Sequence, residues 1–210
     1  MTEKVNIMTN TKSTPAETGD AMNEAIARRV AALRKSNQLT FDELAARSDI
    51  SKGMLVQIEQ GRANPSISTL CKLAAGLRVS VADLVNAGDH PSRSVRIVPP
   101  GSAPVLWQGP KGGSATLLVG AEGPDMLELW DWCLMSGERF ESRPHPAGTQ
   151  ELLSVIEGTL ALEIDGHSHL VGAGSSASAR TDCAHAYACH GKKKVHFSMV
   201  VYESAEGVMH

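Results

Sequence analysis

The sequence predicts an α+β chain of two domains, an all-α domain followed by an all-β domain. Three observations support this. Apolar residues recur at helical spacing from Asn23 to about Val85. The segment NAGDHPSRSVRIVPPGSAP then interrupts the pattern with proline, glycine and polar residues. Beyond it, short apolar or alternating runs are separated by turn residues, as in an antiparallel sandwich or barrel. We therefore expect a disordered tail (1–20), a helical domain (21–87), a linker (88–104) and a β domain (105–210).

Five helices are expected in the first domain, each from a local signal. Ile26, Val30 and Leu33 repeat at helical spacing in the first helix. Thr40 is a candidate N-cap for FDELAARS, with Glu43 three residues later as its capping-box partner. The other three expected helices are KGMLVQIEQ, which follows Ser51 and stops at Gly61, a segment from about Ser68 to Leu77, and VADLV, which Ser80 caps.

The β domain is expected to contain many short strands and no long helix. The candidate strands are VLWQG, ATLLVG, MLELWDWCLM, ELLSVIEG, TLALEIDG and VHFSMVVY. In LEIDGHSHL, the pair Asp165-Gly166 stands between two such runs, which is a strong signal for a β-hairpin.

Composition excludes several classes of protein. The chain of 210 residues is 42% hydrophobic, enough for two globular domains with cores of their own. No apolar run is long enough to cross a bilayer, and the N-terminus lacks a signal-peptide core. The apolar runs are too short for a membrane span, so we expect no membrane partner. The four cysteines form no C-x-x-C pair and nothing else indicates an oxidising compartment, so we expect free thiols and a cytoplasmic location. Residues 21–90 carry nine Lys or Arg against seven Asp or Glu, whereas residues 91–210 carry nine against thirteen. Only the first domain therefore suits a polyanion.

The segment LTFDELAARSDISKGMLVQIEQGRANPSISTLCKLAAGLRVSVADL resembles the phage-repressor type of helix-turn-helix, the XRE family. A short helix, a tight turn and a second helix ending in I-E-x-G-x-x-x-P carry the resemblance. Two short helices joined by a tight turn can project one of them into the major groove, which is wide enough to admit a helix. The resemblance implies that the chain binds double-stranded operator DNA.

On this resemblance the recognition helix begins at Ser51, and Lys52, Gly53 and Gln57 match the base-contacting face. Glutamine can pair with adenine and lysine can reach guanine, while Gly53 permits a close backbone approach and Met54 a contact with a thymine methyl. The positions that match phosphate contacts are Thr40, Arg62 and Asn64. The alternative for each polar residue is a solvated helix face. The family's pattern also implies that Glu59 pairs internally with Arg34 and does not contact DNA.

The segment PHPAGTQELLSVIEG resembles the first motif of the cupin family, in which His-x-His and a short loop precede a Glu and a Gly. Glu151 and Gly158 have the family's spacing. GSSASARTDCAHAYAC resembles the second motif, although Arg180 and Asp182 stand where the family usually has Pro and Gly. The resemblance covers most of residues 125–202. It implies a cupin (double-stranded β-helix) barrel behind the five-helix helix-turn-helix domain.

The family's metal ligands carry over to His145, Glu151 and His185. Imidazole and carboxylate groups suit a divalent ion, with Zn²⁺ as the expected ion and Fe²⁺, Mn²⁺ or Ni²⁺ as alternatives. Arg143 replaces the first histidine of the motif, and a protonated guanidinium cannot ligate a metal. Gln150 is a weak substitute ligand, and Cys183 a stronger one if its side chain turns inward.

Arg143 suits a different task, because its fork of N–H donors can bind a carboxylate, sulfonate or phosphate. Trp130 and Trp132 share a strand face and could line an apolar pocket, with Tyr187 offering a hydroxyl. The alternative for the tryptophans is ordinary core packing. The remaining candidates have no motif around them and are expected at the surface: His167, His169, His190 and His196.

Together these features favour a homodimeric transcriptional regulator, not an enzyme, whose barrel binds a metal, a small anionic effector, or both. One alternative is a bifunctional DNA-binding protein whose metal-dependent barrel is catalytically active, but the replaced histidine argues against it. Another is a barrel that only dimerises the chain, which would leave the three candidate metal ligands without a purpose. A homodimer is expected because regulators of this type usually pair across a two-fold operator.

Overall fold

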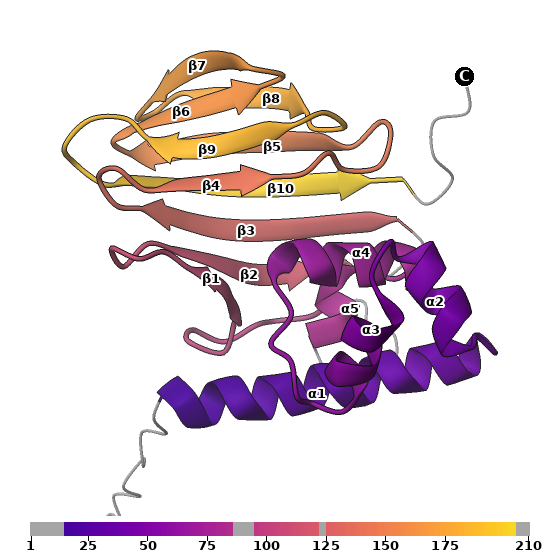
Figure 1. The fold of residues 1–210 in the computed structure, drawn as a ribbon. Coiled ribbons are helices and arrows are strands. Elements are labelled where there is room, and N and C mark those ends of the chain that lie inside the picture. Colours follow the sequence, from indigo (N-terminus) through magenta and orange to yellow (C-terminus); the bar gives the residue numbers. More distant parts are fainter. Residues whose placement is uncertain (1–14, 86–94, 122–124, 205–210) are drawn as a thin grey trace, which may run out of the picture.

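The structure, a computed structural model, describes residues 15–85, 95–121 and 125–204, of which residues 15–21 are described by their backbone alone. Five helices precede ten strands along these residues. Figure 1 shows the helices gathered beside one end of a stack of strands. No helix in the described part of the chain combines the length and the apolar character that a membrane span requires.

The helical domain confirms the predicted capping signals. Its elements are α1 (Pro15–Ser36), α2 (Phe41–Arg47), α3 (Lys52–Glu59), α4 (Ile67–Leu77) and α5 (Val81–Val85). Thr40 and Glu43 form a complete capping box at α2, because each side chain accepts the other's backbone N–H. Ser51 accepts the N–H of Met54 at the start of α3. Asp83 accepts the N–H of Ser80 at α5. The N-cap of α4 is Ser66, two residues before the predicted helix start.

The predicted tail over residues 1–20 is too long. Residues 1–14 lie outside the described part of the chain, but α1 begins at Pro15. Proline suits the first turn of a helix because the N–H that it lacks would have no partner there. The absence of apolar periodicity before residue 21 concealed this extension. The predicted linker (88–104) lies partly outside the described residues, and its described part, residues 95–104, contains neither helix nor strand.

Two antiparallel sheets form the barrel. The larger sheet contains β1 (Val105–Gln108), β2 (Ser114–Gly120), β3 (Met126–Leu134), β10 (Val195–Glu203), β5 (Gln150–Glu157) and β8 (Ser176–Arg180), in that order. The smaller contains β4 (Arg139–Ser142), β9 (His185–Cys189), β6 (Thr159–Ile164) and β7 (His167–Gly172). Figure 1 shows the two sheets facing each other, with β5 and β10 in one and β9 and β4 in the other.

Two turns show how local sequence determines the strand connections. Asp165 and Gly166 have φ angles of 48° and 77°, the left-handed backbone that a tight β-hairpin between β6 and β7 requires. Gly158, between β5 and β6, has a φ of 78°, and a Cβ there would lie 2.2 Å from the carbonyl oxygen of Lys194. The glycine of the first motif is therefore required for both its backbone angle and its close contact.

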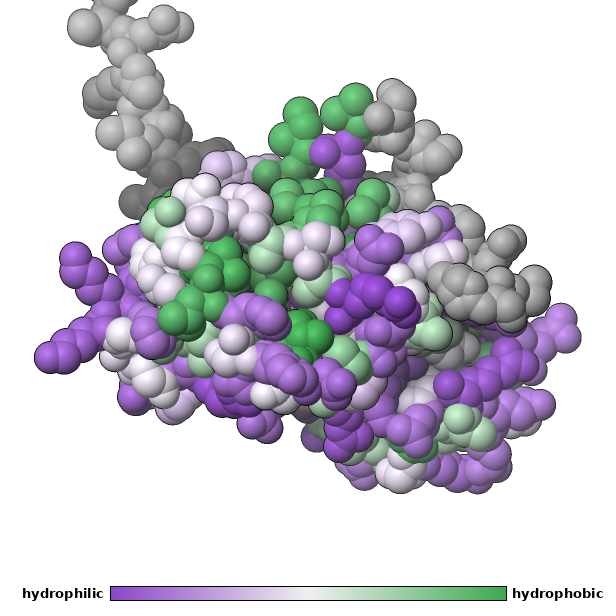
Figure 2. Space-filling model, turned by 90° about the horizontal axis from the view of Figure 1, so that it is seen from above, coloured by the Kyte–Doolittle hydropathy of each residue, from purple (hydrophilic) through white to green (hydrophobic). Residues whose placement is uncertain are grey.

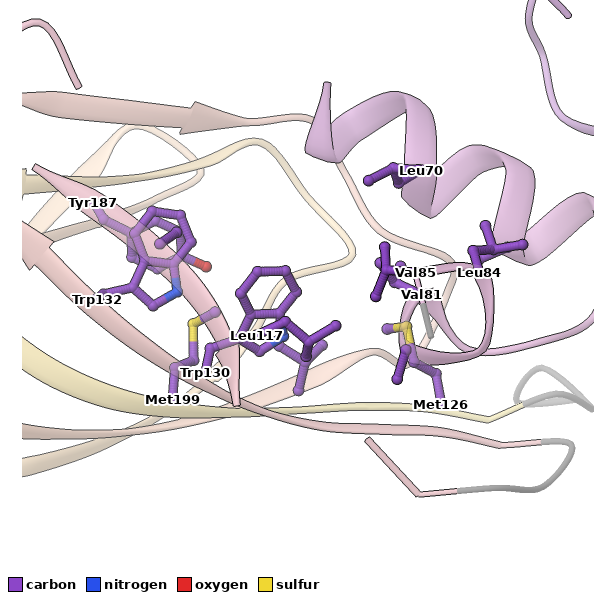
Figure 3. Close-up of a cluster of buried hydrophobic side chains, with 14 of the residues drawn as sticks. Leu70, Val81, Leu84, Val85, Leu117, Met126, Trp130, Trp132, Tyr187 and Met199 are labelled. Atoms are coloured by element: carbon purple, nitrogen blue, oxygen red, sulfur yellow. The ribbon is translucent and has the colours of Figure 1, made fainter. Parts of the chain in front are cut away.

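The helical domain and the barrel share one hydrophobic core. Figure 3 shows Val81 of α5 near Met126 of β3, and Leu84 of α5 and Leu117 of β2 belong to the same buried cluster. The approach is tight at Gly120, where an added Cβ would lie 2.4 Å from that of Ala82. The relative position of the two domains therefore depends on close packing as well as on the connecting chain.

Glu128 of β3 joins the two domains by hydrogen bonds. Its buried carboxylate accepts the backbone N–H of Ala82 in α5 and the indole N–H of Trp130, at 3.0 and 3.2 Å. Burial outweighs these hydrogen bonds and raises the pKa of Glu128 from 4.5 to about 7. The folded protein therefore holds this proton more tightly than the unfolded chain. The associated stability is complete below the unfolded pKa of 4.5 and is lost as the pH rises through about 7.

Candidate functional site

Three side chains predicted as metal ligands converge inside the barrel. Glu151 lies on β5, His185 begins β9, and His145 lies in the loop between β4 and β5. Alternation along β5 turns Glu151 inward, because its neighbours Gln150 and Leu152 are exposed while Glu151 is fully buried. The backbone N–H of His145 donates to the carbonyl of Thr181, which holds the loop over the strand.

The ligand atoms of these residues all lie within 4.8 Å of one another. The Nε2 atoms of His145 and His185 are 3.6 and 3.7 Å from Oε1 of Glu151. These separations exceed the usual length of a hydrogen bond, about 2.7–3.2 Å. They approach the roughly 3.4 Å that separates two ligands bound at about 2.1 Å to one tetrahedral zinc ion.

Hydrogen bonding leaves two atoms of the cluster free to bind an ion. Among the described residues, Glu151 Oε1 and His185 Nε2 are buried without any hydrogen-bond partner. The other atoms of these side chains are engaged, since Tyr187 donates to Glu151 Oε2 and His185 Nδ1 lies 2.8 Å from the carbonyl of Cys183. A donating Nδ1 fixes the tautomer of His185 and directs the lone pair of Nε2 toward Glu151.

The protonation states suit a metal ion. Burial, with a contribution from His185, lowers the pKa of His145 to about 4. Burial also lowers the pKa of His185, against the opposing effect of the Cys183 carbonyl. Both imidazoles are therefore neutral near pH 7, as metal binding requires. Burial raises the pKa of Glu151 to about 7 despite the hydrogen bond from Tyr187, so a nearby cation would favour its ionised form.

This donor set fits a divalent ion of the first transition row. Two imidazoles and one carboxylate bind zinc and ferrous iron in proteins, and three protein ligands leave positions for water or a small molecule. The substitute ligands suggested by the sequence do not join the cluster. Gln150 is exposed, and Cys183 Sγ lies 3.8 Å from the carbonyl of Arg180.

A cavity of about 350 Å³ extends from the cluster to the helical domain. Its volume is typical of a site for a small organic ligand. Aromatic and apolar side chains form much of its wall: Trp130, Trp132, Phe140, Met199 and Val201. His145, Glu151 and Tyr187 lie on its polar side, and the exposed Arg143 borders it. Among the described residues, the guanidinium of Arg143 makes no hydrogen bond or ion pair.

The two predicted pocket tryptophans are core residues as well. Trp130 and Trp132 are 3% and 2% exposed, with ring centroids 6.3 Å apart. Trp132 also stacks on Phe197 and lies 5.6 Å from the Tyr187 ring. Trp130 and Trp132 therefore belong to the core and also line the cavity, and their contact with an effector stays a prediction. Trp132 Nε1 is buried without a partner among the described residues, which leaves a donor available at the cavity wall.

Most of the histidines expected at the surface are exposed there, with one difference. His167, His169 and His190 are exposed. His196 is half-buried, and its Nε2 lies 2.7 Å from Oδ1 of Asp131 on the neighbouring strand. Alternation along β10 explains this contact, since His196 and Asp131 point to the same face of the sheet.

The second candidate site is the exposed face of α3 and its flanks. The base-contacting candidates Lys52, Gly53, Met54 and Gln57 are all exposed, as are Ser51 and the phosphate-contact candidates Thr40, Arg62 and Asn64. Met54, for example, has 45% of its surface exposed although it is apolar. The opposite face of α3 buries Leu55 and Ile58 in the core. The helix therefore presents its polar residues and one exposed methionine to the outside.

Two ion pairs involve residues of α3 and hold their side chains in place. Arg34 binds Glu59 through two hydrogen bonds of 2.6 and 2.9 Å, which confirms the expected internal pair. The sequence did not indicate the second pair, in which Lys52 Nζ lies 2.8 Å from Oδ2 of Asp42. Both partners of this second pair are well exposed, so Lys52 can leave Asp42 at little cost when another anion approaches.

Comparison with known proteins gives matches over both domains. Residues 30–84 match a helix-turn-helix family and residues 130–202 a cupin domain family. The HTH-type transcriptional regulator SutR of Escherichia coli is 29% identical over 170 residues, covering 81% of this chain and 90% of that protein. The uncharacterized HTH-type transcriptional regulator y4dJ of Sinorhizobium fredii is 40% identical over 69 residues, which is 33% of this chain and 90% of that protein.

A solved structure shows the same arrangement of domains over most of its length. The crystal structure of an HTH_3 family transcriptional regulator from Vibrio cholerae matches with a TM-score of 0.71 at 28% sequence identity. The match covers 88% of this chain and 98% of the other.

Proposed function

This chain belongs to the XRE-type helix-turn-helix transcriptional regulators that carry a C-terminal cupin domain, and we propose that its barrel is a metal-containing sensor for a small anionic effector. The observation that carries the proposal is the convergence of His145, Glu151 and His185, because His145 and Glu151 also line a cavity that Arg143 borders. Such regulators bind DNA, and this one would do so in the cytoplasm, where its free cysteines would stay reduced.

The metal is assigned to the three convergent ligands, with Zn²⁺ as the expected ion. It would supply a Lewis-acidic centre with open positions at the polar side of the cavity. The protein would hold the effector between that centre and Arg143, whose N–H groups match a carboxylate, sulfonate or phosphate. The aromatic wall would bury the apolar part of the effector, and Trp132 Nε1 could donate to one of its polar atoms.

A change in operator affinity is the direct test of a sensor. A DNA site selected from a random library would be titrated with the purified chain, before and after chelation of the metal and after reloading with Zn²⁺. We expect the dissociation constant to change about fivefold or more, the usual size of coupling between two sites. An unchanged dissociation constant would mean that the barrel does not report to the DNA-binding domain.

A metal-dependent enzyme is the second candidate, because two histidines and one carboxylate with open positions are also the ligands of catalytic metal sites. We propose that the chain is not an enzyme, since Arg143 occupies the place of the family's first histidine ligand. Turnover of small organic acids by the Fe²⁺-loaded chain in the presence of O₂ would favour the enzyme.

We also propose that the chain acts as a homodimer. The view from above in Figure 2, onto the end of the barrel that carries β7, shows apolar side chains gathered among polar ones. On β5 and β7, Leu152, Ile156 and Leu170 have between 55% and 59% of their surface exposed. A second copy would cover such residues and place two recognition helices on a two-fold operator, with half-sites about 34 Å apart or a multiple of this.

A further inference from the structure

The DNA-binding domain closes one side of the effector cavity. Besides the barrel residues, the cavity is lined by one face of α4: Ile67, Ser68, Cys71, Lys72 and Ala75. This helix follows the recognition helix in the chain and belongs to the same packed core. A molecule in the cavity would therefore contact both domains at once.

Lys72 is the basic residue that α4 contributes to this cavity, and it also binds the turn of the helix-turn-helix. Its Nζ donates to the backbone carbonyl of Asp49 at 2.7 Å and to Asp49 Oδ2 at 2.5 Å. Asp49 lies between α2 and α3, with a left-handed φ of 46°. A strained backbone angle persists only where its surroundings hold it, and Lys72 supplies two of the contacts that do so.

Arg143 lines the same cavity as Lys72, from the barrel side. The hydrogen bond from Lys72 and the charge of Lys72 lower the pKa of Asp49, and the charge of Arg143 adds a smaller effect in the same direction. Asp49 thus lies in the field of two cations that belong to different domains and border one cavity. The acidic residues that also line this cavity are Glu128, Glu141, Glu151 and Glu203. Burial raises the pKa of Glu128, Glu151 and Glu203 to about 7, so these three carboxyl groups are only partly ionised near neutral pH.

We propose that the anionic group of the effector binds between Arg143 and Lys72 and takes Lys72 from Asp49. This inference rests on the proposed sensor function and adds the route by which the sensor acts. The ligand class is a small aromatic acid, because Trp130, Trp132 and Phe140 line the cavity behind the cations.

Loss of its partner would leave Asp49 with an uncompensated negative charge. Its side chain is 90% exposed, and it lies two residues before the N-cap of the recognition helix. A carboxylate at this position repels the phosphate backbone of DNA. The effector therefore weakens operator binding, and it does so without any large rearrangement of the domains.

The probes for the test are benzoate, benzenesulfonate and phenylphosphonate, with benzyl alcohol as the uncharged control. Their affinities would be measured by calorimetry with the full-length, metal-loaded chain, and their effect on operator binding by fluorescence anisotropy at constant ionic strength. The variants are Lys72→Met, Arg143→Met and Asp49→Asn. Lys35→Met is the matched control, because Lys35 is an exposed lysine at the end of α1 that does not line the cavity.

At least one of the three anions is expected to bind the wild type, and to bind Lys72→Met and Arg143→Met about tenfold more weakly or worse, as the loss of one charge-assisted hydrogen bond implies. Lys35→Met should bind that anion normally. Asp49→Asn should also bind it, yet its operator affinity should no longer respond. Without any anion, Lys72→Met should bind the operator more weakly than Lys35→Met, although both lose one positive charge.

The outcomes separate this route from the proposed function. If an anion binds Lys72→Met as tightly as wild type, α4 is not part of the site, while the sensor function stands. If Asp49→Asn still responds to the anion, the signal does not pass through Asp49. If none of the anions binds the wild type, or if Arg143→Met binds them with unchanged affinity, the proposal of an anionic effector is wrong.

Discussion

Replacing Arg34 by methionine tests how α3, the candidate recognition helix, is anchored. The Arg34 guanidinium makes two hydrogen bonds to Glu59 and donates a third to the carbonyl of Leu39 at 3.0 Å. It also lies 4.0 Å from the centre of the Phe41 ring. The two charged side chains are 11% and 7% exposed, so the pair is nearly buried. Methionine keeps most of the apolar stem and removes the charge and the donors.

The expected loss of unfolding free energy follows from the polar groups that the substitution leaves without a partner. Glu59 would keep its charge in a nearly buried position without a partner, and the Leu39 carbonyl would lose a donor. Breaking a buried ion pair from one side costs about 3–5 kcal/mol. We expect a value near the lower end, about 3 kcal/mol, because water can reach side chains at the edge of the α1–α3 contact. Removing both partners, as in Arg34→Met with Glu59→Met, should restore much of this loss, since no charge is then left unpaired.

Urea unfolding followed by circular dichroism in the far ultraviolet is the assay, because all five described helices belong to the DNA-binding domain. The fluorescence of the three tryptophans follows the barrel separately. Arg28→Met is the control. Its pair with Glu24 is 69% exposed on both sides, and the expected loss is about 0.5 kcal/mol or less. A loss for Arg34→Met no larger than for Arg28→Met would refute the anchoring role.

Three further predictions follow from the same structure. Gln57→Ala should cost about 1–3 kcal/mol of operator binding and alter the base preference. Arg62→Ala should weaken binding to all sequences alike and reduce the slope of log affinity against log salt concentration by about one. Equal effects on specific and random DNA for both variants would argue against α3 as the recognition helix. As the pH rises from 5 to 8, the unfolding free energy of the wild type should fall by up to about 3 kcal/mol more than that of Glu128→Gln. The reason is that the pKa of Glu128 is about 7 in the folded protein and 4.5 in the unfolded chain. Parallel pH profiles for these two chains would contradict this. Light scattering should give a dimer for the wild type and a smaller species for a variant with Leu152→Ser and Ile156→Ser; a monomeric wild type would contradict the proposed homodimer.

The sequence predicted those parts of the fold that depend on local signals. Caps at Thr40, Ser51 and Ser80, and the turn at Asp165-Gly166, need only a few neighbouring residues, and each lies where it was expected. Strand β9 was not among the candidate strands, and neither were β4 and β8. The sequences of β4 and β8, RFES and SASAR, are short and polar, because each strand exposes much of its surface. Pairing with β9 and β5, which are distant in the chain, defines them as strands.

The candidate site was likewise predictable only where it depends on recognisable sequence motifs. The resemblance to the cupin motifs implied His145, Glu151 and His185, and the structure brings these three residues together. Nothing in the sequence could indicate that α4 closes the cavity, or that Glu128 bonds to Ala82, since both depend on how the two domains meet. The contact between Lys72 and Asp49 is equally hidden, because 23 residues separate the two in the chain and the helix-turn-helix resemblance implies no role for either.

Metal content is the most direct test of the barrel site. The wild type would be compared with a double variant, His145→Ala with His185→Ala, and with a matched control, His167→Ala with His169→Ala, which removes two exposed histidines of β7. Circular dichroism would verify that all three chains are folded. Elemental analysis should find about one divalent ion per chain in the wild type and the control, and almost none in the first variant. Negligible metal in all three would leave a purely organic pocket, and equal, substantial metal in all three would place the ion elsewhere; either result would contradict a metal centre at His145, Glu151 and His185.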